Sequence, residues 1–172
     1  LGVSLAFTGR IAVGLGLLRQ SLDLARAAGD RGLLMRCYIN IPSLQGGNGD
    51  PRRDILPFAL EGADAARRAR DHASLSWMLA NLADYSIAVG DLALAEAAVE
   101  EAYRAAAAVD YQAMMETAIW RRVLCMAASG HRREASVLLE QMVADSINPD
   151  EPQYSLELEM FRSLVRWLDD PE

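Results

Sequence analysis

The sequence predicts an all-α fold, a right-handed α-solenoid of about four helix-turn-helix repeats of about 40 residues each. Composition gives the first indication, because hydrophobic residues make up 52% of the 172 residues and aromatic residues only 6%. The apolar content is therefore mostly Ala and Leu, which favour helices and close helix packing. The second indication is a set of turn signals at regular spacing, which is typical of repeat proteins.

Glycines mark the first series of turns. Each is followed by a polar or charged residue, and successive members are almost equally spaced along the chain. Gly adopts the left-handed conformation that closes a helix, so each position predicts the end of one helix and the start of the next. The four pairs are Gly9-Arg10, Gly49-Asp50, Gly90-Asp91 and Gly130-His131.

An offset series of turns carries Asp. An Asp side chain accepts hydrogen bonds from the unpaired amides at the start of a helix, where its negative charge is also favourable. With the glycine series, these turns predict two helices in every repeat. The pairs are Gly29-Asp30, Arg70-Asp71, Val109-Asp110 and, more loosely, Pro149-Asp150.

The turns divide the chain into alternating first and second helices. First helices are expected at 1–8, 32–45, 72–89, 112–129 and 153–168. Second helices are expected at 11–28, 54–70, 92–108 and 132–145. We expect one domain over 1–172, with a truncated first repeat at 1–29, repeats at about 30–70, 71–109 and 110–148, and a terminal helix at 153–168.

Apolar or small residues recur at helical spacing within these ranges, and Leu79, Leu82, Ala83 and Ser86 would line one face of the helix at 72–89. Small residues recur where paired helices must approach closely. In first helices they are Gly2, Ala83 and, with a larger side chain, Val123, and in second helices Gly14, Ala95 and Ala135. The two series predict tight packing of each first helix on the second helix that follows it.

The residues around one of these turns resemble the tetratricopeptide repeat, in which a Gly-Asp turn lies between two small residues. Here the small residues are Ala83 and Ala95, and the turn is Gly90-Asp91. The units are longer than the standard repeat, at about 40 residues against about 34, and Asp-containing turns stand where the family has a closing Pro. The resemblance covers essentially the whole chain and implies its architecture.

The longer units are similar to the helical arrays of large bacterial regulators, a group that includes LuxR-type activators, signalling ATPases and ATPases associated with nucleotide cyclases. The similar segments are 27–30, which reads AAGD, and 80–83, which reads ANLA. The resemblance implies a protein-protein interaction or regulatory scaffold module of a multidomain signalling or transcriptional regulator. All 17 basic residues are Arg, which suggests a GC-rich bacterial genome.

We expect the partner, a protein or peptide, to bind on the concave face formed by the first helices. Asn40 and Asn81 occupy equivalent positions, and an Asn ladder can grip the backbone of an extended peptide. Alternatively each Asn bonds a neighbouring helix end, the Trp residues pack between repeats, and Arg121 or Arg122 pairs with an internal carboxylate. The expected groove consists of Arg36, Asn40, Trp77, Asn81, Asp84, Trp120 and Arg121.

Two other functions stay open. The first is a helical array that senses a small-molecule inducer, which needs a closed pocket, for example near the break in the pattern at Pro42. The second is a purely structural spacer, which binds no ligand.

Enzymatic and cofactor chemistry has no support in the sequence. GxSxG, HExxH and GxxxxGK[ST] are all absent from the chain, so we expect neither catalysis nor a cofactor or metal. A net charge of −7 disfavours direct contact with nucleic acid. We expect no membrane span. Cys37 and Cys125 lack paired spacing, so we expect reduced thiols and a cytoplasmic location.

The end of the chain predicts self-association. The helix expected at 153–168 is apolar over a wide arc, so one stripe lies without a partner in this sequence. We expect a homodimer through that stripe, which consists of Met160, Leu164 and Trp167. Because the repeat pattern starts partway through a unit at Leu1, we also expect the chain to be a fragment of a larger protein.

Overall fold

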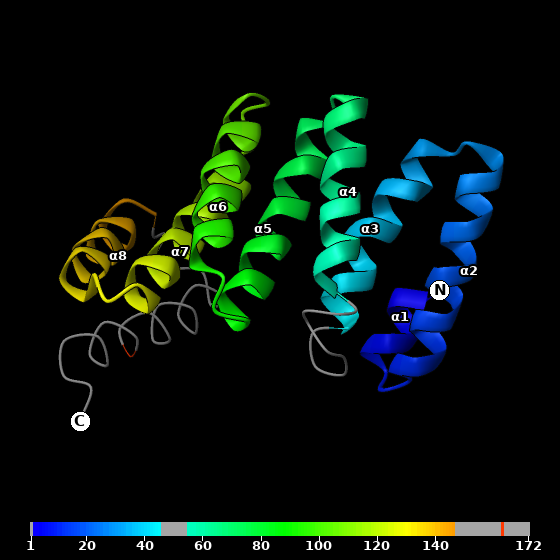
Figure 1. Cartoon of the computed structure of the whole chain (residues 1–172), viewed down its shortest axis with the longest axis horizontal. Coiled ribbons are helices and arrows are strands. Elements are labelled where there is room, and N and C mark those ends of the chain that lie inside the picture. Colours follow the sequence, from blue (N-terminus) through cyan, green and yellow to red (C-terminus); the bar gives the residue numbers. More distant parts are fainter. Residues whose placement is uncertain (1, 46–54, 147–162, 164–172) are drawn as a thin grey trace.

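The computed structural model describes residues 2–45, 55–146 and 163. Within them the chain is all-α, as predicted, with eight helices and no strand (Figure 1). The helices are α1 (Gly2–Phe7), α2 (Ile11–Ala28), α3 (Arg31–Gln45), α4 (Leu56–Ala69), α5 (His72–Ala88), α6 (Leu92–Ala107), α7 (Gln112–Ala128) and α8 (Arg132–Ser146). Each bound lies within two residues of the predicted one. The predicted helix at 153–168, the residues Met160, Leu164 and Trp167, and the turns at Gly49 and Pro149 lie outside the described residues.

One type of turn joins most of these helices. A residue with left-handed backbone ends the helix, and the amide of the next residue donates to the carbonyl five positions earlier, as Asp91 does to Ser86 at 2.8 Å. This is the Schellman arrangement, which satisfies carbonyls that a helix end leaves unpaired. The left-handed residues are Gly9, Gly29, Arg70, Gly90, Asp110 and Gly130. Within each described stretch of the chain these residues are equally spaced.

The prediction for Asp110 is wrong by one position. Asp110 takes the left-handed place with φ 52°, and Tyr111 precedes α7 without making a side-chain cap. Asp30 and Asp71 are confirmed as caps, because each accepts from the amide three residues on, and Asp91 of the glycine series makes the same bond. Asp150 lies outside the described residues. The sequence pattern was ambiguous here because Asp tolerates the left-handed region better than most residues do.

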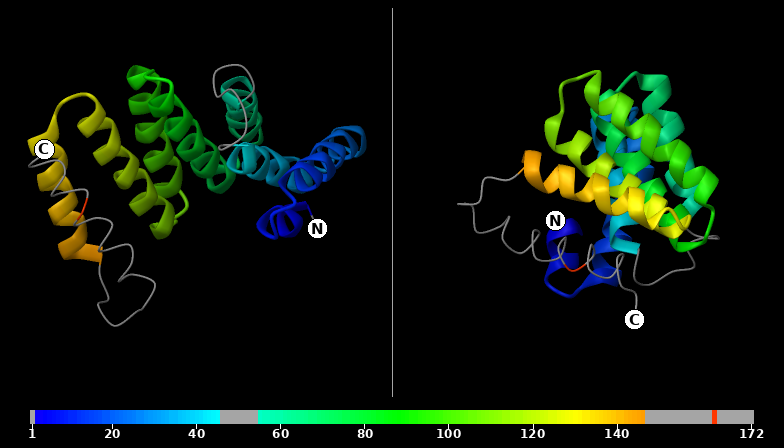
Figure 2. Two further views of the ribbon diagram at one scale, coloured as in Figure 1. Left: turned by 90° about the horizontal axis from the view of Figure 1, so that it is seen from below. Right: turned by 90° about the vertical axis from the view of Figure 1, so that its left-hand side faces the viewer.

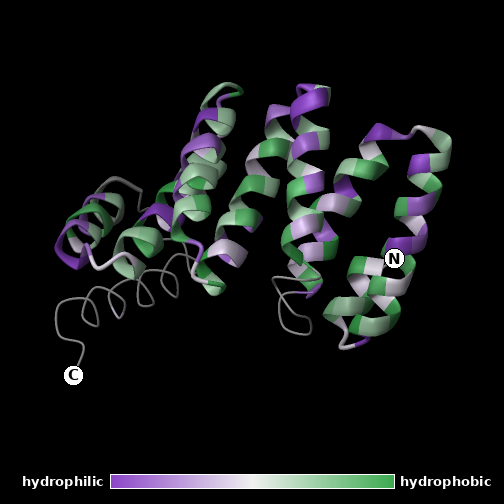
Figure 3. Ribbon diagram, viewed as in Figure 1, coloured by the Kyte–Doolittle hydropathy of each residue, from purple (hydrophilic) through white to green (hydrophobic). Residues whose placement is uncertain are grey.

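The helices follow one another in a bent row from α1 to α8 (Figures 1 and 2). Each helix packs against the next one in the chain, and α1, α3, α5 and α7 also contact one another in succession. Helix α5 lies at the centre and packs against α3, α4, α6 and α7. Figure 3 shows apolar residues along most of α5, which agrees with this burial on several sides.

Small residues allow the paired helices to approach closely. Ala83 and Ala95 are fully buried, as are Val123 and Ala135. Gly62 on α4 adds a contact that the sequence pattern did not indicate, since a Cβ atom there would lie 2.9 Å from Tyr38 Cβ. Many of the buried residues are Ala, so the core gains its stability from short distances between helices as well as from large side chains.

Substitution of Leu82 by Ala should destabilise the fold strongly. Leu82 is 1% exposed in the core around α5, so its truncation leaves a cavity and should cost roughly 2–5 kcal/mol of unfolding free energy. Leu24→Ala, at a position 68% exposed, is the matched control and should have little effect. Urea unfolding followed by circular dichroism measures both, and equal losses would contradict the assigned core.

The left-handed turns predict that one substitution stabilises the protein and another destabilises it. Arg70→Gly should stabilise the protein by about 0.5–1 kcal/mol, because Arg70 has φ 55° and Gly carries no Cβ penalty there. Gly90→Ala should destabilise the protein by about 1–2 kcal/mol, because Gly90 has φ 78°, which is unfavourable for a residue with a Cβ. A Cβ at this position would meet no other atom within 4 Å, so the backbone conformation alone causes the loss. Thermal unfolding of both variants measures the signs, and a stabilising Gly90→Ala would show that the turn relaxes.

Candidate partner-binding face

The residues predicted to form the groove lie on α3, α5 and α7. The left-handed turn residues that precede these helices are Gly29, Arg70 and Asp110. Positions that follow their own turn residue by the same number of residues are equivalent in the three helices. By this register Asn40, Asn81 and Arg121 are equivalent, and so are Ser43 and Asp84.

Asn81 joins α5 to α3. Its side-chain nitrogen donates to the carbonyl of Ile39 and to Oγ of Ser43, both at 3.2 Å. The side-chain nitrogen, which the sequence placed in the groove, is therefore used between helices. The side-chain carbonyl of Asn81 makes none of these bonds, so it keeps its acceptor capacity.

Arg121 joins α7 to α5 in the same manner. Its Nε donates to the carbonyl of Ala80 at 2.9 Å, and its Nη2 pairs with Oδ2 of Asp84 at 2.6 Å. The Arg121 side chain is 20% exposed and that of Asp84 is 40% exposed. Burial raises the pKa of Asp84, an effect that the charge of Arg121 and its hydrogen bond partly offset.

These bonds form one interaction made twice. Ile39 and Ala80 are equivalent by register and supply the carbonyl, Ser43 and Asp84 supply the side-chain acceptor, and the following helix supplies the donor. We call the two sets of bonds the repeated clamp. The clamp joins α3 to α5 and α5 to α7, so three helices form one continuous surface, which we call the odd-helix face.

On α3 the equivalent residue, Asn40, has a different partner. Asn40 donates to the carbonyl of Arg36 on its own helix at 2.7 Å. Arg36 itself is exposed, and its guanidinium pairs with no side chain in the described part of the chain. A carboxylate from outside the chain could therefore reach it without first displacing a described ion pair.

The structure separates the two predicted Trp residues. Trp77 on α5 is 40% exposed, and its Nε1 lies 3.4 Å from the hydroxyl of Tyr111. Trp120 on α7 is partly buried against the apolar cluster of Val123, Leu139 and neighbouring residues between α7 and α8. Trp77 thus offers an open ring surface on the odd-helix face, whereas Trp120 contributes to helix packing.

Tyr85 completes the α3–α5 junction and was missed in the sequence. Its hydroxyl donates to the carbonyl of Pro42, within the last four residues of α3. The carbonyls of a last helical turn lack intrahelical partners, so Tyr85 satisfies one of them. The pKa of Tyr85 is raised to about 12, mainly because the hydroxyl is buried, so the hydroxyl stays a donor at neutral pH. The sequence signal that could have identified Tyr85 is its position one helical turn after Asn81, which places both side chains on the same side of α5.

The odd-helix face offers hydrogen bonding, ion pairing and aromatic contact. Among the described residues there is no group of three or more His, Cys, Asp or Glu side chains arranged for a metal ion. Within the same residues, no helix has both the length and the apolar character required to cross a bilayer.

Comparison with known proteins gives no match: neither the protein-family models nor the curated proteins contain one for this chain.

The repeated clamp predicts a difference between two adjacent arginines. Arg121→Ala should cost about 1.5–3 kcal/mol, because it removes charge-assisted bonds from a mostly buried group. Arg122→Ala, which removes an exposed pair with Glu100, should cost less than about 1 kcal/mol. Chemical unfolding compares them directly, and similar losses would show that the clamp does not hold α7 to α5.

Proposed function

We propose that this chain is a tetratricopeptide-like module, a right-handed solenoid, that binds a protein or peptide partner on the odd-helix face. The repeated clamp carries the proposal, because one interaction made at equivalent positions places three helices side by side. A row of this kind offers an extended surface rather than an enclosed catalytic pocket. The regular recurrence of left-handed turns supports the same architecture.

The chemistry of the face suits an extended peptide. Trp77 offers an aromatic ring that is 40% exposed and otherwise held by packing, which is typical of an interface anchor. Arg36 offers an exposed guanidinium that can hold a carboxylate with two hydrogen bonds. The side-chain carbonyls of Asn40 and Asn81 can accept from peptide amides, since the bonds that both residues make within the described part of the chain use the nitrogen.

The proposal extends to the setting of the module. We place it in the cytoplasm of a bacterium, within a multidomain signalling or transcriptional regulator, where the odd-helix face can contact a partner or another domain of the same chain. The buried, unpaired thiols of Cys37 and Cys125 support a reducing compartment. The resemblance to regulator arrays supports the rest.

Selection from a displayed peptide library tests the partner-binding function. We expect enriched peptides whose affinity falls at least about tenfold, or about 1.4 kcal/mol, on Trp77→Ala. Tyr103→Ala is the matched control, because Tyr103 on α6 is also 40% exposed but lies outside the odd-helix face. Arg36→Ala should weaken those enriched peptides that carry a carboxylate.

Two results would contradict the proposal. One is that no peptide is enriched, which would favour the small-molecule sensor or the structural spacer. The other is that enriched peptides lose affinity on Tyr103→Ala and keep it on Trp77→Ala, which would move the binding surface to α6.

A further inference from the structure

An ion pair made twice links the even-numbered helices. Arg26 on α2 pairs with Glu61 on α4 at 2.7 Å, and Arg67 on α4 pairs with Glu101 on α6 at 2.5 Å. Each of these Arg residues lies three positions before a left-handed turn residue, so the two pairs are the same interaction in successive units. The charges of these arginines therefore serve the fold.

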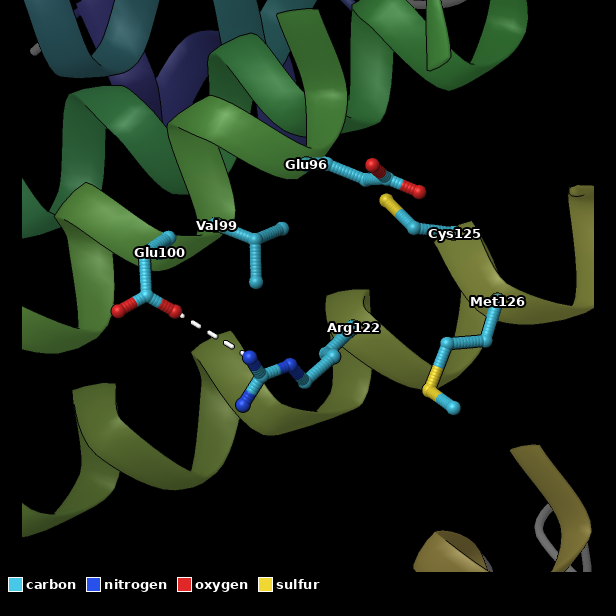
Figure 4. A pocket seen from close by; sticks show the side chains of 6 residues that line it. All are labelled: Glu96, Val99, Glu100, Arg122, Cys125 and Met126. Carbon is cyan, nitrogen blue, oxygen red and sulfur yellow. Dashed lines mark hydrogen bonds and ion pairs between the residues drawn. The ribbon is translucent and has the colours of Figure 1, made fainter. Parts of the chain in front are cut away.

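Arg122 on α7 is engaged in a similar way. It reaches across the hollow between α6 and α7, which has a volume of about 250 Å³, to Glu100 at 3.2 Å (Figure 4). A second hollow, between α7 and α8, is lined by Arg122, Arg133 and Glu134 together with apolar residues. Both hollows carry both signs of charge, so neither indicates a ligand of one sign.

Arg36 on α3 differs from these arginines. It is exposed, and its guanidinium pairs with no side chain in the described part of the chain. Helix α3 contains two arginines and neither Asp nor Glu, although the whole chain has a net charge of −7. At this end of the odd-helix face a carboxylate of a partner meets a cation that no described carboxylate already holds.

The hydrogen bonds between α3 and α5 show how the two helices are aligned. Asn81 donates to the carbonyl of Ile39, and Tyr85, four residues later, donates to the carbonyl of Pro42, three residues later. Later residues of α5 thus contact later residues of α3, so the helices run parallel and in register. Equivalent positions lie side by side, one helix spacing apart, which for packed helices is about 8–10 Å.

Two rows of equivalent positions cross from α3 to α5 on this face. Arg36 and Trp77 form the first row, because each lies seven residues after its left-handed turn residue. Asn40 and Asn81 form the second row, one helical turn further on. A segment that uses both members of a row must present matching groups about 8–10 Å apart.

This spacing restricts the conformation of a bound segment. In a β-strand, the side chains on one face lie about 6.7 Å or about 13 Å apart, which does not match. In a polyproline II segment every third side chain points the same way, about 9.3 Å along the axis, which matches. In an α-helix two turns span about 10.5 Å, which also comes close.

The backbone of the segment decides between the last two conformations. The side-chain carbonyls of Asn40 and Asn81 make none of the described bonds and can accept from amides. The amides of an α-helix are bonded within the helix, whereas a polyproline II segment leaves its amides free to donate. Trp77 agrees with this choice, because its Nε1 already contacts the Tyr111 hydroxyl and polyproline II segments dock on aromatic ring surfaces.

We propose that the odd-helix face binds an acidic polyproline II segment of a partner protein, which crosses α3 and α5. An acidic residue of the segment pairs with Arg36, and an apolar or aromatic residue three positions away packs on Trp77. The amides of these two ligand residues face the side-chain carbonyls of Asn40 and Asn81. This inference rests on the proposed partner-binding function and adds the conformation, charge and spacing of the ligand.

Fluorescence anisotropy with short labelled peptides and the whole chain tests the spacing. A peptide with Glu and Phe separated by two prolines should bind, and its affinity should fall at least about fivefold when one proline is removed or a third is added. Replacement of both prolines by glycines keeps the spacing but removes the preformed conformation, so affinity should fall at least about threefold.

Arg36→Ala tests the acidic position. It should weaken the Glu peptide at least about fivefold and leave the same peptide with Gln in place of Glu within about twofold. Arg31→Ala is the matched control, because Arg31 is also exposed on α3 but lies about 140° around the helix from Arg36.

Four outcomes would overturn this inference. These are no binding of the Glu and Phe peptide, equal affinity at all three spacings, equal affinity of the proline and glycine peptides, and equal losses on Arg36→Ala and Arg31→Ala. The peptide library separates this failure from failure of the proposed function. Enriched peptides that depend on Trp77 but lack the spacing would overturn this inference alone, whereas a library without enrichment would contradict both.

Discussion

The left-handed residues that follow α1, α2, α4, α5, α6 and α7 are the constraint on which the rest of the structure depends. It stops one helix and starts the next at regular intervals, so most of the helices have similar lengths and the same positions meet at successive junctions. Gly fills most of these places because it has no Cβ, whereas Arg70 and Asp110 adopt the same backbone at some cost. A regular turn therefore lets one side-chain interaction serve at more than one junction.

The two sides of the row use this regularity differently. On the odd-helix face the side chains of Asn81 and Arg121 donate to backbone carbonyls of the preceding odd-numbered helix, and α3, α5 and α7 contact one another directly. On the other side, long Arg side chains span from one even-numbered helix to the next. The two sides of the row are therefore held together by different kinds of bond.

This use of side chains shapes what each surface can bind. Asn81 and Arg121 supply donors to the fold, so the odd-helix face offers an aromatic ring, unused acceptors and Arg36 at one end. The hollows on either side of α7 are lined by both carboxylates and arginines beside apolar groups.

The sequence by itself determined the all-α class, the helix bounds to within two residues and the small residues at close junctions, because turn chemistry and helical spacing are local properties. It also grouped Asn81, Asp84 and Arg121 in one expected groove, by their register from the turn residues. Only the tertiary structure decided their partners. Whether Arg121 is open to a ligand or bonded to Ala80 and Asp84 depends on the distance between α5 and α7, which no local pattern specifies.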